Sequence, residues 1–307
     1  LYLLEQPNID VVAITVSGTG LVHCDAGIAQ ALGQLSLVGA DDVPVACGPE
    51  QPLVGFNAFP GSWRAAADDG YGLDLPEGQS PSDLDAPALL KSLINASPHP
   101  IVMYVAGPQT NLATALRSDP GLADNISAVF MTGGALATGS SVARNPDADW
   151  NVWIDPVATD EVIRSGIATT IVPLDATNQV PMTPFHLQAL DAEPSTPAAR
   201  AVATMLGNYE AINSGGVFFW DQVTAAILVD ESYATLQSMP LAVVLDEDRS
   251  VAGRTVLDEM GTPVRVATAV DTSRFQREFL SAISGSDVGA IATETDWTAS
   301  FLSLIHI

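Results

Sequence analysis

A short segment of the chain, residues 145–156, combines the side-chain types that could bind a polyhydroxylated ring. Its oxygen-bearing side chains and its tryptophans are Asp147, Asp149, Asn151, Asp155, Trp150 and Trp153. Carboxylate and amide oxygens can hydrogen-bond hydroxyl groups or face a hard cation, and indole rings can stack on a flat ring. The same composition is also typical of an acidic loop with packing tryptophans, so this segment alone leaves both interpretations open.

The composition favours a large folded core with a strongly acidic surface. Hydrophobic residues make up 47% of the 307 residues, and 36 Asp and Glu oppose 11 Lys and Arg, for a net charge of −25. Such a surface repels phosphate backbones, which argues against nucleic-acid binding. No apolar run has the length of a membrane span. The two cysteines, Cys24 and Cys47, are too few for a disulfide framework, and the pair His23-Cys24 is more typical of packing than of chemistry.

Both ends of the sequence suggest a fragment. It starts at Leu1 without a methionine, and residues 1–4 resemble the last turn of an apolar helix. The apolar end, residues 300–307, resembles translated sequence from outside a gene more than a natural terminus. We therefore expect a single domain over residues 1–307 whose amino-terminal part is missing. The compartment stays open between cytoplasmic and exported, and a homo-oligomer is left open as well.

Strand-like and helix-like segments alternate along the chain. Apolar strands are expected at residues 9–16, 43–47, 101–105, 126–131 and 169–174. Helices are expected at 26–37, 84–96, 110–116, from 155 onward, 198–209, 221–229 and 275–283. This alternation predicts an α/β fold with a mostly parallel open sheet and helices on both faces. Two later segments, 241–245 and 264–267, have the pattern of added antiparallel strands.

Turn-forming or polar residues follow several of the expected strands, at residues 17–20, 107–108, 133–134 and 175–177. The carboxyl edge of an open parallel sheet holds the ligand crevice, so these segments should border it. Asp175 is there either for catalysis or to bond nearby backbone amides, and Asp221 either caps a helix or places a carboxylate at the crevice. No G-x-S-x-G, P-loop or G-x-G-x-x-G motif occurs, which argues against serine hydrolases, NTPases and Rossmann-type dehydrogenases.

Taken in order, these motifs resemble the inosine-uridine-preferring nucleoside hydrolase family over residues 1 to about 285. The matching segments are residues 14–18 (ITVSG), 107–113 (GPQTNLA), 131–134 (MTGG), Trp150-Asn151 with Asp155-Pro156, 172–175 (VPLD) and Trp220-Asp221. The ordered set is more specific than any single motif. The resemblance implies a nucleoside hydrolase-like fold, and cleavage of the N-glycosidic bond of ribonucleosides to free base and ribose. It also implies Ca2+ as cofactor and a small-molecule nucleoside as partner.

The resemblance assigns residues to the metal and to the ribose. Asp221 and the backbone carbonyl of Ala106 fall on calcium ligands of the family. Asn151 falls on the asparagine that binds ribose, and Asp149 stands where the family usually has Glu. The family's D-x-D-x-x-x-D-D motif, which supplies further calcium ligands and the base that activates water, would precede Leu1. The resemblance therefore implies that this chain alone is inactive, while its parent is a hydrolase.

Three further positions depart from the family pattern. Thr19 stands where many relatives carry Asn, and Asn145 could substitute for a second ribose-contacting Asn through a shifted loop. Trp220 stands where some relatives have His as the acid for the leaving base, and would stack on the base instead, as in tryptophan-bearing members. These departures leave two alternatives open. One is a degenerate, non-catalytic protein of the same fold that binds ribose or a nucleoside, and the other is a hydrolase of another N-riboside.

Overall fold

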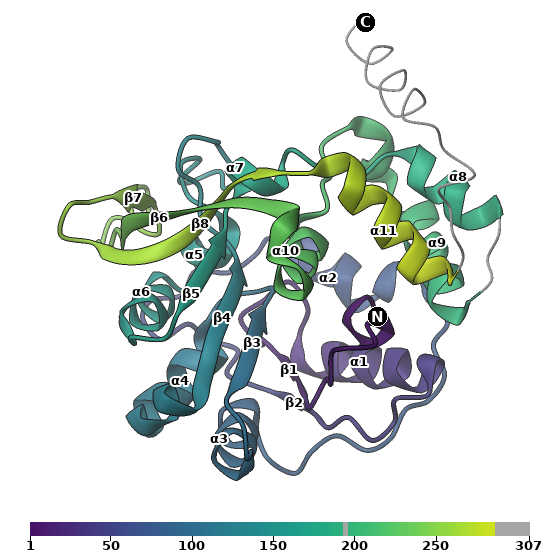
Figure 1. The fold of residues 1–307 in the computed structure, drawn as a ribbon, viewed down its shortest axis with the longest axis horizontal. Coiled ribbons are helices and arrows are strands. Elements are labelled where there is room, and N and C mark those ends of the chain that lie inside the picture. Colours follow the sequence, from purple (N-terminus) through teal and green to yellow (C-terminus); the bar gives the residue numbers. More distant parts are fainter. Residues whose placement is uncertain (193–195, 286–307) are drawn as a thin grey trace, which may run out of the picture.

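A computed structural model of the chain describes residues 1–192 and 196–285, and a six-stranded sheet runs through its centre (Figure 1). In spatial order the strands are β3 (Ile101–Val105), β4 (Ile126–Thr132), β5 (Thr169–Val172), β8 (Thr262–Val270), β6 (Ala234–Val243) and β7 (Thr255–Leu257). The first four are parallel, and β6 and β7 are antiparallel additions. The predicted α/β fold with a mostly parallel sheet is confirmed. Residues 264–267 lie in β8, which pairs parallel with β5 as well as antiparallel with β6, and the expected non-native end at 300–307 lies outside the described residues.

Helices cover both faces of this sheet. One face packs on α3 (Ala86–Ala96), α4 (Thr110–Ser118) and α6 (Pro156–Arg164). The other packs on α7 (Leu174–Thr177), α8 (Pro184–Ala192), α9 (Pro197–Asn208), α10 (Trp220–Val229) and α11 (Thr272–Ser284). Successive strand residues point to opposite faces. Val129 and Met131 of β4 accordingly lie in the first core, and Phe130 lies in the second.

A smaller unit precedes the main sheet. It pairs β1 (Ile14–Val16) with β2 (Val45–Cys47), in parallel, and packs both on α1 (Cys24–Val38). The ladder is shorter than the predicted strands: it starts with Ile14 opposite Val45, directly after Pro44, which has no N–H to donate and only accepts from Ile14. A disulfide joins Cys24 to Cys47, with 5.6 Å between their Cα atoms. The sequence did not predict this bond, because the separation of two cysteines in the sequence does not give the distance between them in the fold.

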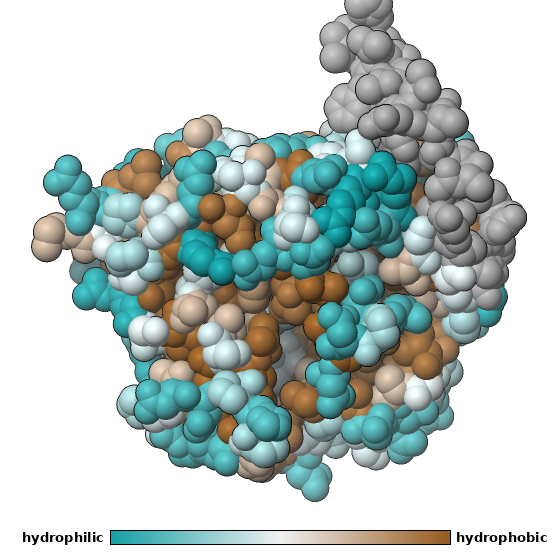
Figure 2. Space-filling view, viewed as in Figure 1, coloured by the Kyte–Doolittle hydropathy of each residue, from teal (hydrophilic) through white to brown (hydrophobic). Residues whose placement is uncertain are grey.

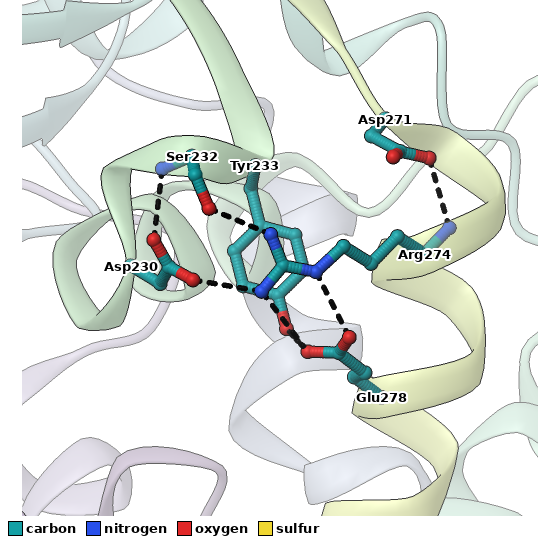
Figure 3. Close-up of polar contacts among 6 residues, drawn as sticks. All are labelled: Asp230, Ser232, Tyr233, Asp271, Arg274 and Glu278. Atoms are coloured by element: carbon teal, nitrogen blue, oxygen red, sulfur yellow. Dashed lines mark hydrogen bonds and ion pairs between the residues drawn. The ribbon is translucent and has the colours of Figure 1, made fainter.

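A cluster around Arg274 ties α11 to the segment that follows α10 (Figure 3). The guanidinium donates to Asp230 (Nη2 to Oδ2, 2.7 Å), Ser232 (Nη1 to Oγ, 2.7 Å) and Glu278 (Nε to Oε1, 2.9 Å). It also lies over the ring of Tyr233, with its Cζ 4.1 Å from the ring centroid. The hydrogen bond from Arg274 lowers the pKa of Asp230 to about 2. Because Asp230 directly follows α10, the cluster fixes the end of that helix.

The surface is uneven in polarity. Figure 2 shows hydrophilic residues along α11 and apolar side chains that reach the surface between β3 and α1. Among the helices of residues 1–192 and 196–285, none combines the length and the apolar character that a membrane crossing requires. The two remaining helices, α2 (Gly61–Asp68) and the short α5 (Trp150–Ile154), lie beside the candidate site.

Candidate functional site

Asn151 connects the carboxyl ends of two adjacent strands. Its Nδ2 donates to the carbonyl of Thr132 at 3.2 Å and to the carbonyl of Ala106 at 3.4 Å. Thr132 is the last residue of β4, and Ala106 directly follows β3. Parallel strands end at the same edge of a sheet, so residues far apart in sequence meet here. The structure thus brings together the predicted ribose residue Asn151 and the predicted calcium ligand, the Ala106 carbonyl.

Asp149 is a buried acid at the start of α5. As the N-cap residue its Oδ1 accepts from the amide of Val152 at 3.2 Å, and the residue is 6% exposed. Gly133 packs closely beside it, since an added Cβ would lie 3.2 Å from Oδ1. Burial raises the pKa of Asp149 to about 6, although several backbone amides oppose that rise. Asp149 therefore keeps its proton to a higher pH than a solvent-exposed Asp, because its ionised form is poorly solvated.

Asp221 is the third acidic or polar side chain of the group. It lies in the first turn of α10, and its main-chain carbonyl accepts from the hydroxyl of Tyr104 in β3 at 2.9 Å. Burial raises the pKa of Asp221 to about 7, and the negative charge of Asp149 adds to the rise, while a hydrogen bond with Thr132 lowers it. The two carboxylates therefore influence each other. This places the predicted calcium ligand Asp221 in the same group as Asp149, Asn151 and Ala106.

Trp220 precedes Asp221, and its indole is held in place by a residue that the sequence did not reveal. Its Nε1 donates to Oδ1 of Asn178 at 2.9 Å, and its ring lies 5.8 Å from that of Phe218, centroid to centroid. Asn178 follows α7, just after β5 ends. No sequence signal marks it beyond its position after a strand. The hydrogen bond fixes the plane of a ring that adjoins the acidic group.

An aromatic cluster lies next to the same group. Trp150 stacks on Phe59 (centroids 5.0 Å apart, planes at 21°), and also contacts Trp63 and Trp153 at 5.4 and 5.6 Å. The indole Nε1 of Trp150 donates to Oγ of Ser141. Trp150 lies between Asp149 and Asn151 in the sequence, so the cluster adjoins the polar residues along the chain. The sequence singled out Trp150 and Trp153 of this cluster but not Phe59.

Thr19 and Asn145 are bonded within the protein near this group. The hydroxyls of Thr19 and Thr110 lie 3.0 Å apart, and Thr110 donates to Asp155 at 2.8 Å. Asn145 is 1% exposed, and its amide donates to the carbonyl of Ala252. Among the described residues, no hydrogen bond joins either side chain to Asp149 or Asn151. Both predicted ribose residues therefore lie in adjoining hydrogen-bond networks.

Two other acids of the predicted crevice have structural partners. Asp155 caps α6, accepting from the amide of Ala158, as expected for Asp-Pro at a helix start. Asp175 accepts from the backbone amides of Leu136, Ala137 and Thr138 at 2.8 to 3.0 Å. The interpretation of Asp175 as a partner of backbone amides therefore has direct support. Its bonds hold the loop between β4 and α5 against α7, which follows β5.

The site combines oxygen donors with unpaired acids. In the part of the chain that the structure describes, no ion pair involves Asp149 or Asp221, and no three His, Cys, Asp or Glu residues form a group that could hold a metal ion. The donors Asp221, Asp149 and the Ala106 carbonyl are all oxygen, which suits a hard cation such as calcium or magnesium. They amount to part of the six to eight ligands that calcium takes.

Comparisons with known proteins agree on one family. The model described as inosine-uridine preferring nucleoside hydrolase matches residues 1–277. A pyrimidine-specific ribonucleoside hydrolase RihA from Citrobacter koseri is 32% identical over 207 residues, which are 66% of this chain and 62% of the relative, so the match spans less than two thirds of its length. Two solved structures are each 27% identical to this chain, and each match covers 92% of this chain and 93% of the other. They are a purine-preferring ribonucleoside hydrolase from Gardnerella vaginalis (TM-score 0.81) and a plant nucleoside hydrolase, PpNRh1 (TM-score 0.83).

Proposed function

Since the chain belongs to the inosine-uridine preferring nucleoside hydrolase family, we propose that the protein hydrolyses the N-glycosidic bond of ribonucleosides, which releases a free base and ribose. One observation carries the proposal. Asp149 with Asn151, Asp221, and the carbonyl of Ala106 come from three separate segments and meet at the carboxyl edge of the sheet. The relatives differ in base, being named pyrimidine-specific in one case and purine-preferring in another, so the base is left open.

The acids suit the charge that develops in this reaction. Cleavage of a glycosidic bond builds positive charge on the sugar ring. Asp149 and Asp221 would stabilise that charge in a site where burial strengthens electrostatic interactions. We assign the ribose hydroxyls to Asp149 and Asn151. Thr19 and Asn145 would support them from adjoining networks, because their own polar groups are bonded within the protein.

The proposal includes a role for calcium, with Asp221 and the Ala106 carbonyl among its ligands. Both donors are oxygens. Asp221 has no cationic partner among the described residues, and a bound cation would favour its ionised form. When bound, calcium would orient a water molecule and lower its pKa. Asp221, with its pKa raised to about 7, would lose its proton to take this role.

The leaving base would face aromatic side chains. The indole of Trp220 is held by Asn178 and adjoins Asp221, which suits stacking on a purine or pyrimidine. Trp has no proton to give a departing base nitrogen at neutral pH. The proton would then come from water, and stacking would stabilise the base as it leaves.

The test measures the free base that the parent protein releases from inosine and from uridine, by chromatography, with calcium and with a chelator. We expect release only with calcium, and a loss of roughly 100-fold or more in Asp221→Asn, because that variant loses a charged ligand. Asp124→Asn is the matched control, since Asp124 is exposed at the other end of β4. Release that is unchanged in Asp221→Asn would contradict the assignment. Tight nucleoside binding without any release would favour the non-catalytic alternative.

A further inference from the structure

The Cys24–Cys47 disulfide lies at the start of the loop that carries part of the aromatic cluster. Cys47 is the last residue of β2, and residues 48–60, here called the β2–α2 loop, follow it directly. Cys24 is the first residue of α1. Both cysteines are half-buried, so a small reductant can reach the bond. They are the only two cysteines in the sequence, so any effect of a thiol reductant on the protein must act through this pair.

The beginning of the β2–α2 loop is held tightly. The amide of Cys24 donates to Oε1 of Glu50 at 3.2 Å. Gly48 packs so closely on Asn111 that an added Cβ would lie 1.8 Å from its Oδ1. In turn, Asn111 donates to the carbonyl of Val16 in β1 at 2.9 Å. The disulfide joins α1 to β2 at the point where the loop begins, and the start of α4 packs on the same point through Asn111.

Beyond this point the β2–α2 loop has no helix or strand, and a few contacts hold it. The amide of Leu53 donates to Asp155 at 2.9 Å, Asn57 donates to the carbonyl of Trp153, and Phe59 stacks on Trp150. Phe56 is 71% exposed. A segment with few buried contacts moves more readily than the sheet it crosses. Its position therefore depends on how firmly its first residues are fixed.

We propose that the Cys24–Cys47 disulfide is a redox-dependent positioning element for the substrate site. In the oxidised protein it fixes the start of the β2–α2 loop, so that Phe59 stays against Trp150. Trp150 lies between Asp149 and Asn151 in the sequence. In the dithiol form the loop loses the covalent restraint at its start and keeps only the contacts of Gly48 and Glu50, so it moves more and a ligand must order it on binding. The consequence for nucleoside binding rests on the proposed function, whereas the consequence for loop motion does not.

The redox step is a thiol–disulfide exchange with a dithiol reductant. One thiolate of the dithiol attacks a sulfur of the pair, so that the protein S–S bond breaks and a mixed disulfide forms. The second thiol of the reductant then attacks the mixed disulfide and closes a cyclic disulfide. Two electrons pass to the protein, and the two protons that the dithiol gives up end on the Cys24 and Cys47 thiols. The oxidised form is the one that an oxidising compartment would keep.

The experiment compares the oxidised protein, the protein reduced by dithiothreitol, and the Cys24→Ser/Cys47→Ser variant. Thiol titration verifies each state. Hydrogen exchange of residues 48–60 reports the loop, and kcat and KM for the better of inosine and uridine report the site. We expect faster exchange in the loop and a KM raised about three- to tenfold, with kcat nearly constant, because the ligand now orders the loop. The serine variant should behave like the reduced protein and should not respond to dithiothreitol.

The outcomes separate a positioning element from a simple stabilising bond. If loop exchange or KM is the same in the oxidised and reduced proteins, the proposal is wrong, and the disulfide only stabilises the fold. A fall in kcat at constant KM would also overturn it, since it would place the effect in the chemical step. If no form releases base, the proposed function fails on its own. Loop exchange, together with calorimetric binding of the nucleosides, then decides the positioning role.

Discussion

Replacement of Asp149 by Asn should stabilise the metal-free protein, and should do so more at pH 7.5 than at pH 5. Burial raises the pKa of Asp149 to about 6 in the folded protein, against about 3.9 in an unfolded chain. A folded-state pKa above the unfolded one favours the protonated form. The stability contributed by this carboxyl is therefore full below about pH 4 and is lost as the pH rises through about 6.

The linkage relation gives the size of the effect. With these two pKa values, ionisation of Asp149 lowers the free energy of unfolding by about 1.5 kcal/mol at pH 5 and about 2.8 kcal/mol at pH 7.5. Asn has nearly the same shape and remains a good N-cap, so its oxygen can still accept from Val152. Its amide nitrogen cannot accept the other backbone bonds, and this loss is independent of pH. The gain from Asp149→Asn should therefore be about 1.3 kcal/mol larger at pH 7.5 than at pH 5.

The assay is urea unfolding of the wild type and of Asp149→Asn, with a chelator present, at both pH values. The difference between variant and wild type is compared across pH, so that titration of the acids remote from Asp149 cancels. Asp124→Asn, which replaces an exposed carboxylate, is the control. A gain for Asp149→Asn that is equal at the two pH values, or larger at pH 5, would refute the reasoning that burial controls this acid.

Three further changes test the framework around the site. Arg274→Met should lower the free energy of unfolding by about 1–2 kcal/mol at pH 7, allowing for its partial exposure, as measured by urea unfolding. Less should be lost at pH 3, because the lowered pKa of Asp230 means that its contribution disappears as the pH falls towards 2. Thr110→Val removes the donor to buried Asp155 and should cost about 1–3 kcal/mol, which thermal unfolding would detect. The Cys24→Ser/Cys47→Ser variant should have a free energy of unfolding about 3 kcal/mol lower, as measured in urea, because the bond closes a loop of 23 residues.

The parallel part of the fold could be predicted because its strands are buried on both faces and read as apolar runs. β3, β4 and β5 lie within a residue or two of the expected segments. The antiparallel part could be predicted only in part. β6 includes residues 241–243 of the expected strand 241–245, but it is more than three times as long as that stretch, because its first half, including Gln237 and Ser238, is largely exposed and carries no apolar pattern. Nothing local shows that β8 inserts between β5 and β6, since strand order depends on contacts remote in sequence.

The same distinction applies to the site. Asp149, Asn151 and Asp221 stand within or next to the ordered motifs that resemble the nucleoside hydrolase family, and this match pointed to them from the sequence alone. Phe59 and Asn178 lie outside those motifs. Phe59 stacks on Trp150 from a loop far earlier in the chain. Asn178 lies beyond β5 and accepts a hydrogen bond from Trp220. Such residues support the site only through side-chain contacts in the folded protein, and a single sequence does not show those contacts.

The energetics explain why the acids, of all the polar residues, carry the functional meaning. Most charged groups of the described chain are exposed or form an ion pair, as Arg274 does with Asp230 and Glu278. Asp149 and Asp221 instead share one enclosed edge, and each raises the cost of ionising the pair. An arrangement in which burial of the acids outweighs their hydrogen bonds is expected where positive charge arrives, as a cation or on a reacting sugar. The stability gained by Asp149→Asn would then measure what the fold gives up for its ligand.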